Sequence, residues 1–209
     1  MKSSTKRTTV VIAGNLVNPV LGLMWAIFAA STWMTWNRTH SVVALLLFCV
    51  NTLFAVLFIT RRHSKAYSTE PKDWMITAAT ILLSFSLRVV GPSSRFAQGA
   101  SQGIQGAAVM LILISLIALG RSFGLIPANR GVKTHSLYSW VRHPLYSGEI
   151  LFYFGFVLGN ITTLNVVIFT CIILGLAIRA SAEERLLKKD QTYAEYLQRV
   201  RFRFFPGVY

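Results

Sequence analysis

The chain has 209 residues, of which 54% are apolar and only 13% are charged. Soluble domains carry about 25% charged residues, and here the apolar residues come in long blocks, so the composition excludes an ordinary soluble domain and predicts a helical membrane protein. The net charge of +14 fits cationic loops that face anionic headgroups. We therefore expect membrane lipids as partners, and no nucleic acid.

Six apolar segments predict the elements that cross the membrane. They are residues 10–34, 41–60, 74–91, 103–120, 145–159 and 162–178. The first four approach the roughly 20 residues that a helix needs to cross a bilayer. The last two are shorter and are separated by the turn signal at Gly159-Asn160. The expected fold is all-α and polytopic: four transmembrane helices, a C-terminal helical hairpin that brings the total to five or six spans, and a cytosolic C-terminal helix.

The cationic residues predict the orientation of these segments. All Lys and Arg residues except Arg38, Arg88 and Arg95 fall in the pieces 1–9, 61–73, 121–144 and 179–209. Because cytoplasmic loops are rich in Lys and Arg, we expect an integral membrane protein whose N-terminus and active site are cytoplasmic. The first apolar segment is too long for the core of a signal peptide, so we interpret it as a retained span.

The chain divides by character into residues 1–100, the N-terminal transmembrane helices, and 101–209, a catalytic region with a cofactor loop, the hairpin and the C-terminal helix. Small residues open the fourth span at Gly99, Gly103 and Gly106, and such spacing lets helices approach closely. Packing within the chain is the favoured interpretation, with a homodimer contact or a tight substrate wall as alternatives. Tryptophans near the span ends, Trp25 among them, predict an interfacial belt.

Motifs of several enzyme classes are absent from the sequence. There is no GxGxxG, Walker loop, HExxH or GxSxG, which argues against dinucleotide enzymes, P-loop ATPases, zinc proteases and standard esterases. Cys49 and Cys171 lie inside apolar runs and have no Cys/His spacing suited to zinc. We expect neither a metal site nor a disulfide framework.

Two polar clusters interrupt the apolar pattern. The first, 120–149, mixes glycines, aromatics and cations, and its Arg142-His143-Pro144 opens an apolar helix whose free amides can hold an anion. Glu149 follows at the membrane edge, where a carboxylate usually has a partner. In the second cluster, Arg179 and Glu183 share a helix face. The region 179–203 that follows predicts a charged helix that proline stops at Phe204-Phe205-Pro206.

These clusters resemble a known family. The carrying residues are Arg142-His143-Pro144-Leu145-Tyr146-Ser147-Gly148, then Glu183-Glu184 about 35 residues later, Tyr193-Ala-Glu-Tyr196-Leu-Gln-Arg-Val200, and Phe205-Pro206. Together they resemble the isoprenylcysteine carboxyl methyltransferase family of membrane methyltransferases, whose broader group includes phospholipid N-methyltransferases. The resemblance covers about residues 120–209. Lys188–Tyr193 departs from the family pattern, which often has Phe-Gly before the tyrosine pair.

The resemblance implies S-adenosylmethionine as the methyl donor, bound at the cytosolic membrane face. The residues that it implies for cofactor binding are Arg130, Gly131, Val132, Lys133, Tyr138, His143, Pro144, Leu145, Tyr146 and Glu183. It also implies that Arg179 faces the methyl acceptor. The chemistry agrees, because a carboxylate such as Glu183 suits the ammonium of the donor, while Tyr138, Tyr146 or Trp140 could pack on its adenine.

The residues leave the acceptor open. Arg179 can hold a carboxylate with two parallel hydrogen bonds, and a carboxylate needs no base for methylation because it is already deprotonated. This favours a carboxylate acceptor. Together with the resemblance, it implies carboxyl O-methylation of a lipophilic, isoprenylcysteine-like or lipidated acceptor, bound by Arg179 and Glu149 in a cavity between the fourth span and the hairpin. A phospholipid or other lipid amine is the alternative, with Glu149 or Glu184 as the base.

A non-enzyme alternative is a small transporter or channel subunit. Arg88 and the small residues of the fourth span favour it. Against it, the spans show no pair of interrupted segments in matching halves.

Overall fold

The structure is a computed structural model that describes residues 2–60, 66–68, 70–92, 94–125 and 127–208. Its longer helices are α1 (Lys2–Thr39), α2 (Val42–Thr60), α3 (Pro71–Phe85), α4 (Arg95–Leu119), α5 (Pro144–Gly159), α6 (Thr163–Leu187) and α7 (Gln191–Arg199). The shorter elements are the 3-10 helices η1 (Gly120–Ser122) and η2 (Ser136–Ser139), and the antiparallel strands β1 (Ala66–Tyr67) and β2 (Ala128–Asn129). Residues 61–65 and the side chains of 2–17, which carry part of the predicted positive charge, lie outside the described part.

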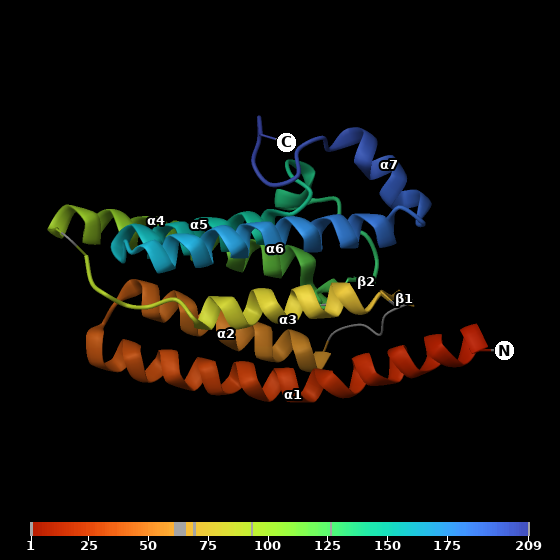
Figure 1. The fold of residues 1–209 in the computed structure, drawn as a ribbon, viewed down its shortest axis with the longest axis horizontal. Coiled ribbons are helices and arrows are strands. Elements are labelled where there is room, and N and C mark those ends of the chain that lie inside the picture. Colours follow the sequence, from red (N-terminus) through yellow and green to blue (C-terminus); the bar gives the residue numbers. More distant parts are fainter. Residues whose placement is uncertain (1, 61–65, 69, 93, 126, 209) are drawn as a thin grey trace.

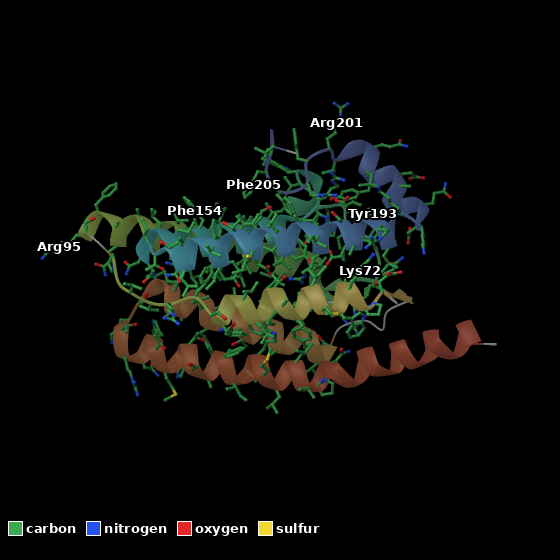
Figure 2. All side chains as sticks on the ribbon, viewed as in Figure 1. Lys72, Arg95, Phe154, Tyr193, Arg201 and Phe205 are labelled. Atoms are coloured by element: carbon green, nitrogen blue, oxygen red, sulfur yellow. The ribbon has the colours of Figure 1, made fainter. Side chains whose placement is uncertain are left out.

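The long helices run roughly along one axis of the molecule (Figure 1). α1 packs on α2, α2 on α4, α4 on α5, and α3 on α6. The N-terminus of α1, the strand pair and α7 all lie at one end, which we call the loop end. Arg95 marks the opposite end, far from Lys72 and Tyr193 (Figure 2).

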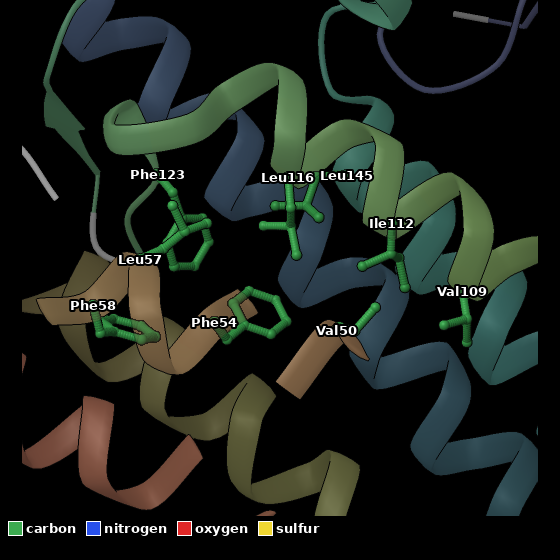
Figure 3. Packing of buried hydrophobic residues seen from close by; sticks show 9 residues of the cluster. All are labelled: Val50, Phe54, Leu57, Phe58, Val109, Ile112, Leu116, Phe123 and Leu145. Carbon is green, nitrogen blue, oxygen red and sulfur yellow. The ribbon is translucent and has the colours of Figure 1, made fainter. Parts of the chain in front are cut away.

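A hydrophobic cluster joins α2 and α4 near the loop end (Figure 3). Phe123, which follows η1, is almost fully buried between two aromatic rings of α2. Its ring centroid lies 5.1 Å from that of Phe54 and 5.2 Å from that of Phe58. Edge-on and tilted aromatic contacts of this kind contribute beyond the area they bury. The cluster therefore fixes where the chain leaves α4 and enters the polar loop.

The protein is an all-α membrane protein. Three stretches within the described residues are long and apolar enough to cross a membrane: Val42–Thr60, Arg95–Ser122 and Thr163–Leu187. α3 and α5 have only 15 and 16 residues. Leu23, Ile59, Met75 and Ile117 are large apolar side chains that stay more than half exposed, as expected of side chains that face lipid.

The third segment differs from its prediction, because the helix ends at Phe85 rather than near residue 91. The chain beyond it is held by two asparagines, one that follows α5 and one in the first turn of α6. Asn165 accepts a hydrogen bond from the Arg88 amide (3.0 Å) and donates one to the Arg88 carbonyl (2.9 Å). Asn160 accepts from the amides of Val90 (2.9 Å) and Gly91 (3.0 Å). These bonds replace the helical ones, so the segment need not continue as a helix.

The glycines at the close contact between α4 and α5 are not the ones that the sequence predicted. A methyl group on Gly148 of α5 would lie 2.6 Å from the side chain of Ile112 on α4, and one on Gly159 would lie 2.5 Å from Ser101 Oγ. Gly99, Gly103 and Gly106 have no described atom within 4 Å of that position. Packing within the chain is therefore made by Ser101 of this small-residue segment and not by the three glycines, and the homodimer contact stays a prediction.

The predicted C-terminal helix is broken. α6 ends at Leu187, and Asp190 caps a separate helix by accepting a hydrogen bond from the Thr192 amide (3.1 Å). α7 ends at Arg199, well before Pro206, so proline is not what stops it. The chain after it runs back across the start of α5, where its carbonyl oxygens at Phe202 and Arg203 accept from the amides of 142 and 143 (both 2.9 Å).

Candidate active site

A cavity of about 100 Å³ lies at the loop end, and we call it the loop-end cavity. It collects residues from the end of α4, the 122–133 loop, η2, the start of α5, the end of α6, and α7. The predicted cofactor residues that line it are Arg130, Gly131, Val132, Lys133, Tyr138, His143, Leu145, Tyr146 and Glu183. Residues as far apart in the sequence as Leu119 and Tyr196, 77 positions, thus meet at one place.

The loop 122–133 is folded on itself by its own small and polar residues. The guanidinium of Arg130 occupies the space where a side chain on Gly124 would be, since a methyl group there would lie 2.2 Å from Arg130 Nη1. Ser122 Oγ donates to the Arg130 carbonyl (3.1 Å), and Asn129 Oδ1 accepts from the Gly131 amide (3.0 Å). Gly131 has φ of 100°, a conformation that favours glycine. This turn directs residues 130–133 along the cavity.

Tyr196 of α7 attaches η2 to the bundle. Its hydroxyl donates to the Tyr138 carbonyl (2.6 Å), and both tyrosines are almost fully buried. Burial raises the pKa of Tyr196, which the nearby Glu184 also raises and Arg142 lowers. Burial, with a smaller effect of the Glu183 carboxylate, likewise raises the pKa of Tyr138. Both rings therefore stay neutral near pH 7, and Tyr138 presents an uncharged aromatic wall to the cavity.

α5 begins inside the site. Pro144 is its first residue and is fully buried, and His143 occupies the N-cap position. Proline suits this position because its fixed φ matches a helix and no amide hydrogen is needed there. The amides of Leu145 and Tyr146 belong to the first turn, which has no partner within its own helix. Since both residues line the cavity, this helix start offers donors to an anionic group.

Glu184 is a structural anchor. It is 3% exposed, and its Oε1 lies 3.1 Å from His143 Nε2 and 3.3 Å from Arg142 Nη1. Its Oε2 lies 2.8 Å from Arg203 Nη2, and Arg203 Nε donates to Oε1 (3.1 Å). A carboxylate so fully engaged holds α6, the start of α5 and the C-terminal segment together. It is therefore poorly placed to act as the base considered for an amine acceptor.

Glu183, its neighbour, faces the loop-end cavity. The Tyr146 hydroxyl donates a hydrogen bond to Glu183 Oε1, and His143 Nδ1 lies 3.8 Å from Oε2. The rings of His143 and Tyr146 stack, with centroids 5.5 Å apart and planes 9° from parallel. The Glu183 side chain keeps 22% of its surface exposed. It is thus an oriented carboxylate that can still receive a cation.

Arg179 and Glu149 do not line the loop-end cavity. They belong to a second cavity of about 210 Å³ inside the bundle, which we call the apolar cavity. Arg179 is 4% exposed, its Nη2 donates to the Leu125 carbonyl (3.0 Å), and its Nε has no hydrogen-bond partner among the described residues. In the structure as described, Arg179 and Glu183 form no ion pair at a distance of 4.0 Å or less. The surface ion pair that their spacing permits is therefore not formed.

Tyr146 and Arg179 bring the linings of the two cavities into contact. Among the described residues, none lines both cavities. Tyr146 lines the loop-end cavity, Arg179 lines the apolar cavity, and the guanidinium carbon lies 5.0 Å from the centroid of the Tyr146 ring. Each cavity thus contributes one member of this contact, an aromatic ring from the loop-end cavity and a guanidinium from the apolar cavity.

Some predicted residues lie elsewhere. Pro144 supports the loop-end cavity without lining it. Trp140 is 70% exposed and does not line the cavity, so it cannot pack on a molecule bound there. Arg88, on which the transporter alternative depended, lies exposed in the connection after α3 and lines neither cavity.

The walls of the apolar cavity were not predicted. Besides α4, α5 and α6 they come from α1, α2 and α3, so the cavity is not simply between the fourth span and the hairpin. Trp25 is one of these wall residues and stacks on Phe54, with centroids 4.4 Å apart, so its assignment to an interfacial belt was wrong. Isolated aromatics inside apolar segments carry no local signal of a cavity. Tyr193 and Tyr196, also missed as lining residues, were visible as part of the motif.

Comparisons with known proteins give a family but no activity. No curated protein matches the chain significantly. A family model described as "Protein of unknown function (DUF1295)" matches residues 74–200, a range that starts in α3 and ends just after α7. It contains the whole lining of the loop-end cavity and both charged residues of the apolar cavity. Because the match covers more than half of the chain, the protein belongs to this DUF1295 family.

Proposed function

We propose that the protein is an S-adenosylmethionine-dependent methyltransferase that acts on a lipophilic acceptor. The observation that carries this proposal is the pair of cavities that meet at the Tyr146–Arg179 contact, of which the loop-end cavity is lined by more polar and charged residues than the apolar cavity. A polar donor would find a matching environment in the loop-end cavity, and a lipophilic acceptor would find one in the apolar cavity. For a direct displacement, the Tyr146 and Arg179 side chains that lie between them must move apart so that the methyl carbon meets the acceptor atom. Bringing two reactants to one contact is itself a large part of such a rate enhancement.

The residues of the loop-end cavity fit this donor. S-adenosylmethionine would supply a methyl group on a positively charged sulfonium. Glu183 can bind its ammonium, the amides that begin α5 can bind its carboxylate, and the buried ring of Tyr138 offers an apolar wall for adenine. Arg130 to Lys133 would lie alongside.

Arg179 supports a carboxylate acceptor. Its Nε is buried without a partner and its Nη2 is fixed by the Leu125 carbonyl, so the guanidinium is preorganised and still able to donate. The acceptor is therefore a lipophilic or lipidated carboxylate, and the reaction is carboxyl O-methylation. Glu149 in the same cavity favours the second candidate, a lipid amine, because it could take the proton that an ammonium must lose before methylation.

We also propose that α1, α3 and α5 cross the membrane beside the three apolar helices, with the α5–α6 pair as a hairpin and the loop end in the cytoplasm. The support is the gathering of Lys and Arg at the loop end. A cysteine introduced at Lys189 should resist membrane-impermeant reagents in intact cells. Its labelling from outside would contradict this orientation.

The proposal is tested by cofactor binding. The purified chain in lipid nanodiscs should bind S-adenosylmethionine in a calorimetric titration, and Glu183→Gln should weaken binding tenfold or more. Glu195→Gln, an exposed carboxylate on α7, is the matched control and should bind like the unchanged chain. Absence of binding by folded protein would refute the proposed function.

A further inference from the structure

The apolar cavity has two residues of charged type in its lining. Most of the lining is aromatic or aliphatic, contributed by residues such as Trp25, Phe54 and Val109, with a few uncharged polar side chains. Among the described residues that line it, Arg179 and Glu149 are the two of charged type, and they lie close enough to interact electrostatically. A cavity with apolar walls and a few polar groups is typical of a site for a lipophilic molecule with a compact headgroup.

The two charged groups do not neutralise each other directly. No ion pair joins them within the 4.0 Å that defines one among the described residues. Arg179 Nη2 donates a hydrogen bond to the Leu125 carbonyl, and the buried Arg179 Nε has no hydrogen-bond partner among the described residues. Within the described chain, Glu149 has neither a hydrogen bond nor an ion pair. Inside a membrane, such groups normally pair or mark a binding site.

A headgroup with a single charge satisfies only one of them. An anion would pair with Arg179 but would bring a second negative charge near Glu149. A cation would pair with Glu149 but would oppose Arg179. Charges left unpaired in a desolvated site cost binding energy, and like charges brought together cost more. A headgroup with one charge of each sign satisfies both.

We propose that the apolar cavity binds a lipophilic zwitterion of the amino-acid type, with its carboxylate at Arg179 and its ammonium at Glu149. A carboxylate is the favoured anion because it matches one guanidinium with two parallel hydrogen bonds, and among the described lining residues the only cation is Arg179. The role of this zwitterion as the methyl acceptor rests on the proposed function. The preference of the cavity for a zwitterionic headgroup does not. Glu149 is then a specificity-determining residue.

The test uses three probes that share one alkyl chain. They are α-aminohexadecanoic acid, its N-acetyl derivative, which is a monoanion, and its methyl ester, which is a monocation. Binding of each to the purified full chain in nanodiscs is measured by calorimetry at pH 7, without cofactor. We expect the zwitterion to bind at least tenfold more tightly than either derivative. Equal affinities for the zwitterion and the N-acetyl derivative would overturn the proposal.

The variant Glu149→Gln should bind the zwitterion at least tenfold more weakly and the N-acetyl derivative no more weakly than before. Glu195→Gln is again the matched control. Unchanged zwitterion affinity in Glu149→Gln would overturn the proposal, and the three-probe comparison on the unchanged chain decides the matter if the variant does not fold. S-adenosylmethionine is titrated separately. Its failure to bind would refute the proposed function while leaving the headgroup preference standing.

Discussion

The Arg179 guanidinium lies 5.0 Å from the centre of the Tyr146 ring, while the Tyr146 hydroxyl donates to Glu183 on the other side. Tyr146 thus contacts Glu183 of the loop-end cavity through its hydroxyl and Arg179 of the apolar cavity through its ring. Substitutions that remove the hydroxyl or the ring can therefore separate these two contacts.

Tyr146→Phe removes only the bond to Glu183. We expect S-adenosylmethionine to bind about threefold to tenfold more weakly, because a hydrogen bond to a charged group contributes about 1.5–3 kcal/mol and water replaces part of it. Binding of a lipophilic carboxylate in the apolar cavity should stay unchanged. Tyr146→Leu also removes the ring and should weaken both. Calorimetric titration of both ligands checks this, and an equal effect of Phe and Leu on the carboxylate would contradict it.

Glu184→Gln should destabilise the C-terminal segment. The change leaves Arg142 and Arg203 facing a neutral amide in a site where Glu184 is 3% exposed, and loss of one partner from a buried ion pair costs about 3–5 kcal/mol. We expect a lower melting temperature and faster trypsin cleavage after Arg201. Glu195→Gln serves as the exposed control. Cleavage at the rate of the unchanged chain would show that the anchor does not hold the segment.

Gly148→Ala should destabilise the contact between α4 and α5. The added methyl group would lie 2.6 Å from the Ile112 side chain and 3.2 Å from its amide nitrogen, and overpacking of this kind costs about 1–3 kcal/mol. Gly103→Ala, where no described atom lies within 4 Å, should leave stability unchanged or slightly raised. Thermal unfolding in detergent compares the two. A larger loss in Gly103→Ala would instead indicate a partner on that face of α4.

Tyr196 predicts an alkaline dependence of stability. Burial raises its pKa in the folded protein above the ordinary value near 10, so the unfolded chain loses this proton first. Its contribution to stability is therefore complete below about pH 10 and is lost as the pH rises toward the folded pKa. Tyr196→Phe should be less stable at pH 8 and should lose less stability between pH 9 and pH 12. Denaturant midpoints across that range measure both effects, and parallel curves would contradict the assignment.

The sequence predicted those features that depend on short motifs or on continuous apolar segments. The resemblance carried by the motif around His143 and by Glu183 implied about half of the residues that line the loop-end cavity, because those residues lie in short segments whose sequence pattern the family shares. The all-α membrane class followed from apolar blocks alone. Which glycines lie at a contact could not be predicted, since Gly148 and Gly103 differ only in what stands opposite them.

The apolar cavity shows the same limit. Phe54 and Trp25 come from helices whose sequences give no sign of what they face. The role of Glu184 was also missed, because its partners Arg142 and Arg203 are distant in sequence and are brought together by the returning C-terminal chain.

The asparagine bonds to residues 88–91 also have a consequence for the order in which the chain can be inserted. The partners of these amides, Asn160 and Asn165, are made only after α4 and α5. Unpaired amides cost several kcal/mol each in hydrocarbon. During synthesis, residues 88–91 must therefore stay hydrated at the membrane boundary until α6 begins to emerge. A chain truncated before residue 160 should leave a cysteine placed at Val90 reactive, and protection of that cysteine would contradict this order.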